Sequence, residues 1–387
     1  MIKWLSRLIK PRDEVAIVEW RTKYSLYRHI LTNVNTIGQL PSTYKLPDNT
    51  KTGTVDKEKA SIYDVEFEFR QDDSLKKELQ DLAEKLKKIA NEGNREAAVE
   101  FYSTITKYSN VSSIIDAFLD EISSHSLDIE PHLFAFAKDL MLNTGHKNGV
   151  KFGIAILGLC QNKTIIEKLK TLGLYNEFTL YVAISILNLS ENPEGDLWDL
   201  GRRVHGWGKI QLIERLVKIC KTEELKDWLI DDGYKNNIHN QHLACLCAIY
   251  GELDKKVSIN IIDEKLYNNT REILNILLSP GPADDISCYH NAPSTMSNFI
   301  KHSYQHANQV KDFILLHKVK LYLDNQFISN QRTRWTDYQI AECLLDLDKI
   351  MDSNIWKVIV KDILLNPYDK DYTDAREAAS LMGLTVI

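Results

Sequence analysis

The sequence predicts an all-α protein, a HEAT- or armadillo-like α-solenoid of antiparallel helix pairs with a short, irregular N-terminal extension. From Asp72 onward, apolar residues recur at three- and four-residue spacing, the breaks between these runs are short, and two mid-chain segments resemble each other. This spacing is typical of amphipathic helices, and short breaks favour antiparallel neighbours. We therefore divide the chain into an extension of residues 1–70 and a helical-repeat domain of residues 71–387.

The composition is that of a soluble globular protein. Of the 387 residues, 44% are apolar and 26% are charged, and the formal net charge of −6 gives no global attraction for nucleic acid. No apolar run approaches the roughly 18 to 20 residues that a transmembrane helix requires. With no secretory leader in view, we expect a cytoplasmic protein whose six cysteines are reduced, buried thiols.

The extension differs in composition from the rest of the chain. Residues 1–10 are basic and amphipathic, and we expect them to pack on the protein body or fray, with contact to a membrane surface as the alternative. The segments Val15–Val18 and Tyr63–Phe69 fit short strands, so a β-hairpin is the expected alternative to irregular structure. Between them, Pro41–Glu58 is typical of an exposed loop.

Helical patterns fill the chain after the extension. The first run ends at Gly93, which predicts a left-handed helix terminus. Central repeats are expected over about residues 130–290, because segments opening at Lys163 and Lys221 resemble each other at an offset of about 60 residues. C-terminal capping helices are expected over about residues 291–387. The expected helices beyond the first are 97–107, 112–122, 130–142, 149–160, 165–172, 178–189, 294–306, 310–327, 338–351, 355–365 and 372–381.

One junction combines glycine, aromatic and cationic residues within eight positions. We expect a helix over 196–204 to end at His205-Gly206 and a new one to begin at Gly208 or Lys209. Backbone amides at such a start attract anions, glycines admit a ligand, cations add charge and Trp207 offers a stacking face. The candidate ligand-binding residues are Arg202, Arg203, His205, Gly206, Trp207, Gly208 and Lys209.

A purely structural role is the alternative for this junction. Glycines also permit close helix packing, Trp207 would then fill the core, and the arginines would be solvated or pair with Glu214 and Asp199. The sequence leaves both interpretations open.

The second candidate cluster consists of His239, His242 and Cys245, spaced three residues apart. On one helix they would share a face and could bind a metal. Structural zinc sites usually have paired cysteine spacings with a second pair elsewhere, and no such partner is found in the sequence. We therefore expect helix-surface histidines beside core thiols and no metal site.

Motifs for other chemistry are absent from the sequence. It has no nucleophile elbow, phosphate-binding loop, calcium loop or pair of diiron Glu-x-x-His elements. A haem-thiolate loop, a flavin fingerprint and a facial triad are also absent. We expect no cofactor.

Five stretches of the chain carry a family resemblance: Leu133–Leu140, Gly149–Leu157, Glu177–Ala183, Val204–Leu216 and Ile276–Ala283. Together they resemble a poorly characterised bacterial family, some members of which are named limonene hydroxylase. The resemblance spans roughly residues 130–290 and is most specific at His205-Gly-Trp-Gly208. It implies a HEAT-like helical fold and, through the family name, terpene oxidation.

These observations lead to three functional hypotheses. The first is a non-catalytic helical-repeat protein that binds an acidic or phosphate-bearing protein or peptide partner through the Arg202–Lys209 junction. The alternative is a cofactor-dependent monooxygenase, as the family name implies. A HEAT-like DNA-binding or DNA-repair module is the third, although the net charge of −6 disfavours it.

Overall fold

The structure, a computed structural model, describes residues 20–22, 24–47, 73–108, 111–123, 131–279, 285–328 and 334–384. Within these ranges the fold is helical and contains no strand; a single isolated bridge joins Arg21 and Thr144. The all-α prediction is confirmed for this part of the chain. Both expected strands and residues 1–10 lie outside the described residues. The solenoid arrangement stays a prediction.

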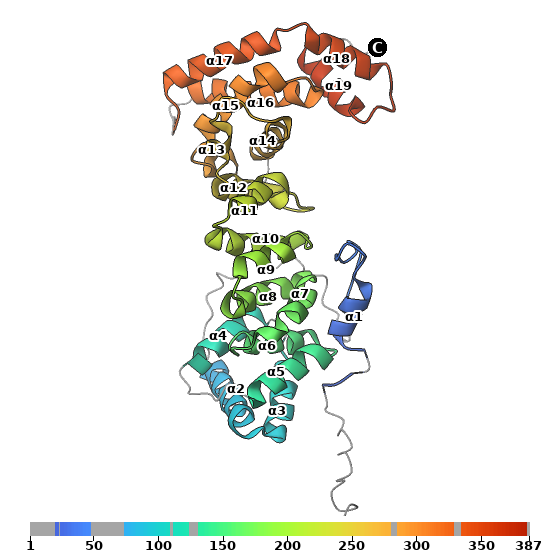
Figure 1. The fold of residues 1–387 in the computed structure, drawn as a ribbon, viewed down its shortest axis with the longest axis vertical. Coiled ribbons are helices and arrows are strands. Elements are labelled where there is room, and N and C mark those ends of the chain that lie inside the picture. Colours follow the sequence, from blue (N-terminus) through green and yellow to red (C-terminus); the bar gives the residue numbers. More distant parts are fainter. Residues whose placement is uncertain are drawn as a thin grey trace, which may run out of the picture. The chain divides into compact units, whose positions relative to one another are not determined.

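Two compact units divide the chain, residues 1–212 and 213–387, with the boundary inside α10. In the first unit, consecutive helices pack as pairs, α2 with α3, α5 with α6 and α7 with α8 (Figure 1). Its helices are α1 (Leu26–Asn33), α2 (Asp73–Glu92), α3 (Arg95–Ile105), α4 (Ser112–Ser123), α5 (His132–Asn143), α6 (Lys147–Leu157), η3 (Lys163–Ile165), α7 (Ile166–Gly173), α8 (Asn176–Leu189), α9 (Pro193–Gly201) and α10 (Gly206–Leu216).

Aromatic side chains form the core of the first unit. The rings of Phe101, Phe118, Phe136 and Phe152 lie with centroids 5.6 to 5.8 Å apart, and all four are buried. Edge-to-face contacts of this kind add to the stabilisation from apolar burial. Gly93 has φ +61° after α2, as predicted for a left-handed helix terminus. The Asn94 side chain accepts a hydrogen bond from the Ala97 amide at 2.9 Å and caps α3, a signal that the sequence prediction did not include.

Part of the expected N-terminal extension belongs to this unit. The short helix α1, which the sequence pattern did not predict, packs against α5 and α7 and buries Leu26 and Ile30 (Figure 1). Just before it, the buried Trp20 donates its ring N–H to Asp139 at 2.9 Å. Residues 20–22 and 24–47 are therefore anchored to the helices.

The second unit contains the C-terminal helices, which lie where the sequence placed them to within two residues. At the start of α17, Thr336 and Gln339 form a reciprocal capping box. No helix of the described ranges is long and apolar enough to cross a membrane. The elements are η4 (Val217–Ile219), α11 (Glu223–Trp228), the π-helical η5 (Leu229–Gly233), α12 (Asn240–Tyr250), α13 (Leu253–Val257), α14 (Glu264–Leu277), η6 (Ile286–Cys288), α15 (Ala292–His306), α16 (Val310–Ile328), α17 (Asp337–Met351), α18 (Ile355–Leu364) and α19 (Tyr372–Leu381).

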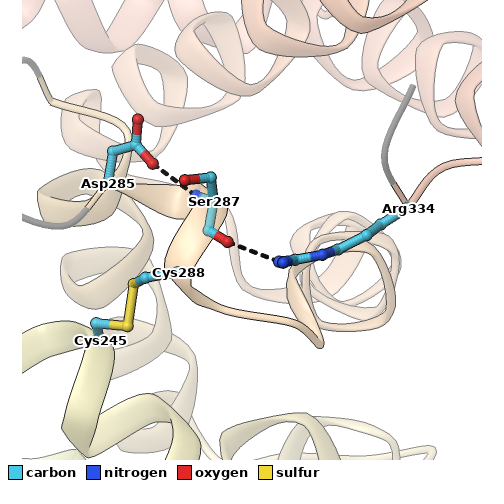
Figure 2. Close-up of a disulfide and its surroundings, with 5 residues drawn as sticks. All are labelled: Cys245, Asp285, Ser287, Cys288 and Arg334. Carbon is cyan, nitrogen blue, oxygen red and sulfur yellow. Dashed lines mark hydrogen bonds between the residues drawn. A yellow bond between two sulfur atoms is a disulfide. The ribbon is translucent and has the colours of Figure 1, made fainter. Parts of the chain in front are cut away.

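A disulfide joins Cys245 of α12 to Cys288 at the end of η6 (Figure 2). The expectation that all six cysteines are reduced is therefore wrong for this pair. The two residues are 43 positions apart, and the packing of the second unit brings their Cα atoms to 6.4 Å, a separation that suits a disulfide. Among the described residues, the cysteines at 160, 220, 247 and 343 form no disulfide.

The segment that carries Cys288 is also held by hydrogen bonds. The Asp285 carboxylate accepts a hydrogen bond from the Ser287 amide at 2.7 Å, and the Arg334 guanidinium donates to the Ser287 carbonyl oxygen at 2.7 Å (Figure 2). These contacts link η6 to the residues that precede α17.

Candidate functional site

The central junction lies two to three residues earlier in the chain than the sequence predicted. Helix α9 begins at Pro193, with the Asn192 side chain accepting a hydrogen bond from the Gly195 amide at 3.1 Å, and it ends at Gly201. Helix α10 begins at Gly206, two residues before the earliest predicted start. Only four residues, 202–205, separate the two helices.

Both glycines of the junction pack against α8. Gly206 has φ +67°, which favours glycine, and a Cβ there would lie 2.9 Å from the side-chain nitrogen Nδ2 of Asn176. At Gly208 a Cβ would collide with the Thr179 hydroxyl, and the Gly208 amide donates a hydrogen bond to Asn176 Oδ1 at 3.3 Å. The space beside the glycines is thus filled by α8, and Asn176 takes one of the amides at the α10 N-terminus.

Arg203 and Lys209 are engaged within the protein. The Arg203 guanidinium pairs with the Asp199 carboxylate, and its Nε donates to the Asp199 carbonyl oxygen at 3.1 Å. Asp199 also receives Lys170 at 3.1 Å. Lys209 is only 5% exposed, and Trp207 is half-buried. These side chains therefore contribute mainly to packing and ion pairing.

Arg202 is placed differently from its neighbour. Its guanidinium lies over the Trp198 ring, 5.2 Å from the centroid, and its side chain is 54% exposed. The separation from Asp199 is 3.7 Å, longer than a hydrogen bond. From the N-terminal segment, the Gln39 side chain donates to the Arg202 carbonyl oxygen at 3.2 Å. Arg202 is therefore held at its backbone and on one ring face, while its N–H donors are only loosely paired.

His205 lies three residues after Arg202 and is exposed to solvent. Partial desolvation, together with the positive charge of Lys209, lowers the pKa of His205 below its ordinary value of 6.5. The lowered pKa therefore favours the neutral form of the ring at pH 7. An anion bound beside it would favour the protonated form and raise this pKa.

A second charged cluster lies at the start of α8. Glu177 pairs with Lys147 at 2.6 Å and Lys151 at 3.2 Å, both from α6. Burial raises the pKa of Glu177, but the two lysines outweigh it, so the pKa falls below its ordinary value of 4.5. No local sequence pattern indicates this cluster, because Glu177 and the two lysines come from different helices.

The second sequence candidate, His239, His242 and Cys245, does not form a metal site. His239 precedes α12 as its N-cap with φ +47°, so it does not share the helix face of the other two residues. His242 pairs with Glu214 at 2.9 Å, and the sulfur of Cys245 is bound to Cys288. The expected core thiol at Cys245 is therefore wrong, and Cys245 cannot serve as a metal ligand in this state, because a disulfide sulfur is not a thiolate donor. No group of three or more potential metal ligands occurs in the described ranges.

Two residues that contact Arg202 were missed by sequence reasoning. Trp198 supplies the ring beneath Arg202, and their four-residue spacing on α9 was the available signal. Gln39 is 163 positions from Arg202, and no local pattern connects them. No protein-family model, no curated protein and no solved structure matches this chain.

Proposed function

We propose that this chain is a non-catalytic helical binding protein that recognises an acidic or phosphate-bearing group of a protein or peptide partner. The observation that carries the proposal is Arg202, which is stacked on Trp198, more than half exposed and only loosely paired with Asp199. The contact surface consists of Arg202, Trp198 and His205.

Preorganisation makes Arg202 a suitable anchor. Stacking restricts its rotamers before a partner arrives, which reduces the entropy cost of binding, about 0.5–1.5 kcal/mol for a long side chain. Because its distance to Asp199 is 3.7 Å, Arg202 can turn its donors to a new acceptor without breaking a short hydrogen bond. Tryptophan and arginine are also the residue types most enriched at binding hot spots.

The chemistry of the guanidinium favours an oxyanion. Its planar fork matches the two oxygens of a carboxylate or phosphate, and such charge-assisted pairs are stronger than neutral hydrogen bonds. The nearest carboxylate, Asp199, is already shared with Arg203 and Lys170, which weakens its hold on Arg202. An external anion therefore competes for Arg202 only with Asp199, whose carboxylate already pairs with two other cations.

The proposal is tested by fluorescence anisotropy with the full-length chain and three labelled peptides of otherwise identical sequence. One carries a phosphoserine, one a glutamate and one a serine. We expect tighter binding of the two anionic peptides, with Arg202→Ala weakening it about tenfold or more, as for loss of a charge-assisted hydrogen bond. Arg376→Ala on α19 is the matched control, since Arg376 is also an exposed arginine and should be dispensable.

Three outcomes would overturn the proposal. Equal affinity of the wild type for all three peptides would show that the chain does not recognise the anionic group. Equal binding by the wild type and Arg202→Ala would show that Arg202 is not part of the binding site. Preference for duplex DNA, with affinity that falls steeply between about 50 mM and 200 mM salt, would assign the chain to the nucleic-acid class instead.

A further inference from the structure

Helix α18 presents two opposite apolar faces, and within the described part of the chain only one of them is covered. Trp356 and Val360, four residues apart, are buried against α16 and α19. The Trp356 ring lies 5.5 Å from that of Phe313, and its N–H donates to the Ile350 carbonyl oxygen at 2.8 Å. This inner face fixes α18 on the second unit.

The outer face is apolar and open. Ile355 is 50% exposed, Val358 66% and Leu365 82%. With Asp362, these residues are spaced three, four and three apart, which places them on one side of a helix. Leu365 continues the helical conformation as the C-cap, with φ −67° and ψ −22°. A helix face that meets only water normally carries polar residues.

We infer that the outer face of α18 pairs with the same face of a second copy of this chain, in an antiparallel two-fold contact. In such a pairing, Ile355 lies opposite Leu365 of the second copy, and Val358 lies opposite Asp362. The two-fold axis then passes near residue 360, so Lys361 of one copy comes within reach of Asp362 of the other.

The charges at the centre of this face fit a second copy. Lys361 and Asp362 are both exposed, and within the described residues neither forms an ion pair. They are adjacent in sequence and next to the proposed axis, so one two-fold operation pairs both lysines with both aspartates. An apolar seam with opposite charges at its own centre is self-complementary, which is what an isologous interface requires.

Size predicts a weak dimer. A contact made by one helix face of each copy buries a small surface area. Interfaces that bury less than roughly 1,200 Å² in total are usually transient. We therefore expect dissociation in the micromolar range or weaker, and a monomer in dilute solution.

Sedimentation velocity of the full-length chain, from low micromolar to several hundred micromolar, tests the inference. The wild type should shift with concentration toward twice the chain mass of 44.6 kDa. Val358→Glu should remain monomeric throughout. Leu345→Glu on α17 is the control, because Leu345 is similarly exposed, at 62%, but is not part of the outer face.

Charge reversal provides a second test at two exposed positions. Lys361→Glu and Asp362→Lys should each raise the dissociation constant at least about tenfold, because each places like charges at the axis. The double reversal should restore dimerisation to nearly the wild-type level. A wild type that is monomeric at every concentration, or single reversals that dimerise normally, would overturn the inference.

Cosedimentation with phosphatidylserine vesicles addresses another occupant of the same face. Vesicle binding by a monomeric wild type that Val358→Glu abolishes would mean that the face meets a membrane rather than a second copy. That result would also overturn the inference.

Discussion

The Gly208 amide donates a hydrogen bond to the side-chain oxygen of Asn176, 3.3 Å away, so the start of α10 is capped by the first residue of α8. Gly208 also lies directly against Thr179, one turn further along α8. The helix N-terminus that the sequence offered as an anion site is thus partly satisfied within the protein. What the junction leaves accessible is a cationic side chain, Arg202.

Gly208→Ala should destabilise the first unit. The new methyl group would collide with the Thr179 hydroxyl, which already donates to the Gly173 carbonyl oxygen at 2.8 Å, and overpacking of this kind costs about 1–3 kcal/mol. Urea unfolding measures the loss. In a Thr179→Ala background the same substitution should cost less, because the colliding oxygen is gone; an equal cost in both backgrounds would contradict the packing account.

The Cys245–Cys288 disulfide should stabilise the second unit. It closes a loop of 43 residues, so the chain-entropy relation gives about 4 kcal/mol, with about 2–4 kcal/mol as the usual range. Cys288→Ser should lower the free energy of unfolding by that amount, whereas Cys220→Ser, at a cysteine outside the disulfide, should change it little. A thiol assay on denatured, unreduced protein should find four of the six cysteines reactive, and six would exclude the disulfide.

Glu177 should make stability depend on pH in the acid range. Because its folded-state pKa is lower than its ordinary value of 4.5, the stabilisation is full above that value and is lost as pH falls through the folded pKa. The difference in unfolding free energy between wild type and Glu177→Gln should therefore shrink as pH decreases below 4.5. Glu191→Gln is the control: its ion pair with Lys163 is exposed and should contribute little at any pH. A pH-independent difference for Glu177→Gln would contradict the account.

When an anion binds, His205 should become protonated. The pKa of the free histidine lies below its ordinary value of 6.5, and a bound anion raises it, so affinity should increase as pH falls from about 8 to about 6. The glutamate peptide is the appropriate probe, because its charge is constant over this range. His205→Asn should flatten the pH profile, whereas His290→Asn, at an exposed histidine of the second unit, should leave it unchanged. If the affinity of the wild type does not change with pH, His205 is not part of the contact surface.

The helices could be predicted well because their signals are local. Gly93 ends α2 as expected, and the C-terminal helices follow the apolar spacing to within two residues. Helix α1 was missed because it has only eight residues, and its buried Leu26 and Ile30 are stabilised by α5 and α7 rather than by a long periodic pattern.

The candidate site could be predicted only in part. The sequence located the junction, because glycine, tryptophan and arginine are concentrated there. It could not distinguish Arg202 from Arg203, since the difference comes from the loose and tight contacts of each with Asp199. The Cys245–Cys288 pairing was also beyond the sequence, because spacing alone does not determine which cysteines meet in the folded chain.

The most direct test of the central claim is a double-mutant cycle between Arg202 and the anionic group of the peptide. Binding of the phosphoserine and serine peptides is measured with wild type and with Arg202→Ala. Direct contact predicts a coupling free energy of about 1.5–3 kcal/mol, because Arg202→Ala should weaken binding of the phosphoserine peptide and barely change binding of the serine peptide. If the effects of the two changes simply add, Arg202 does not contact the anion and the proposed site is wrong.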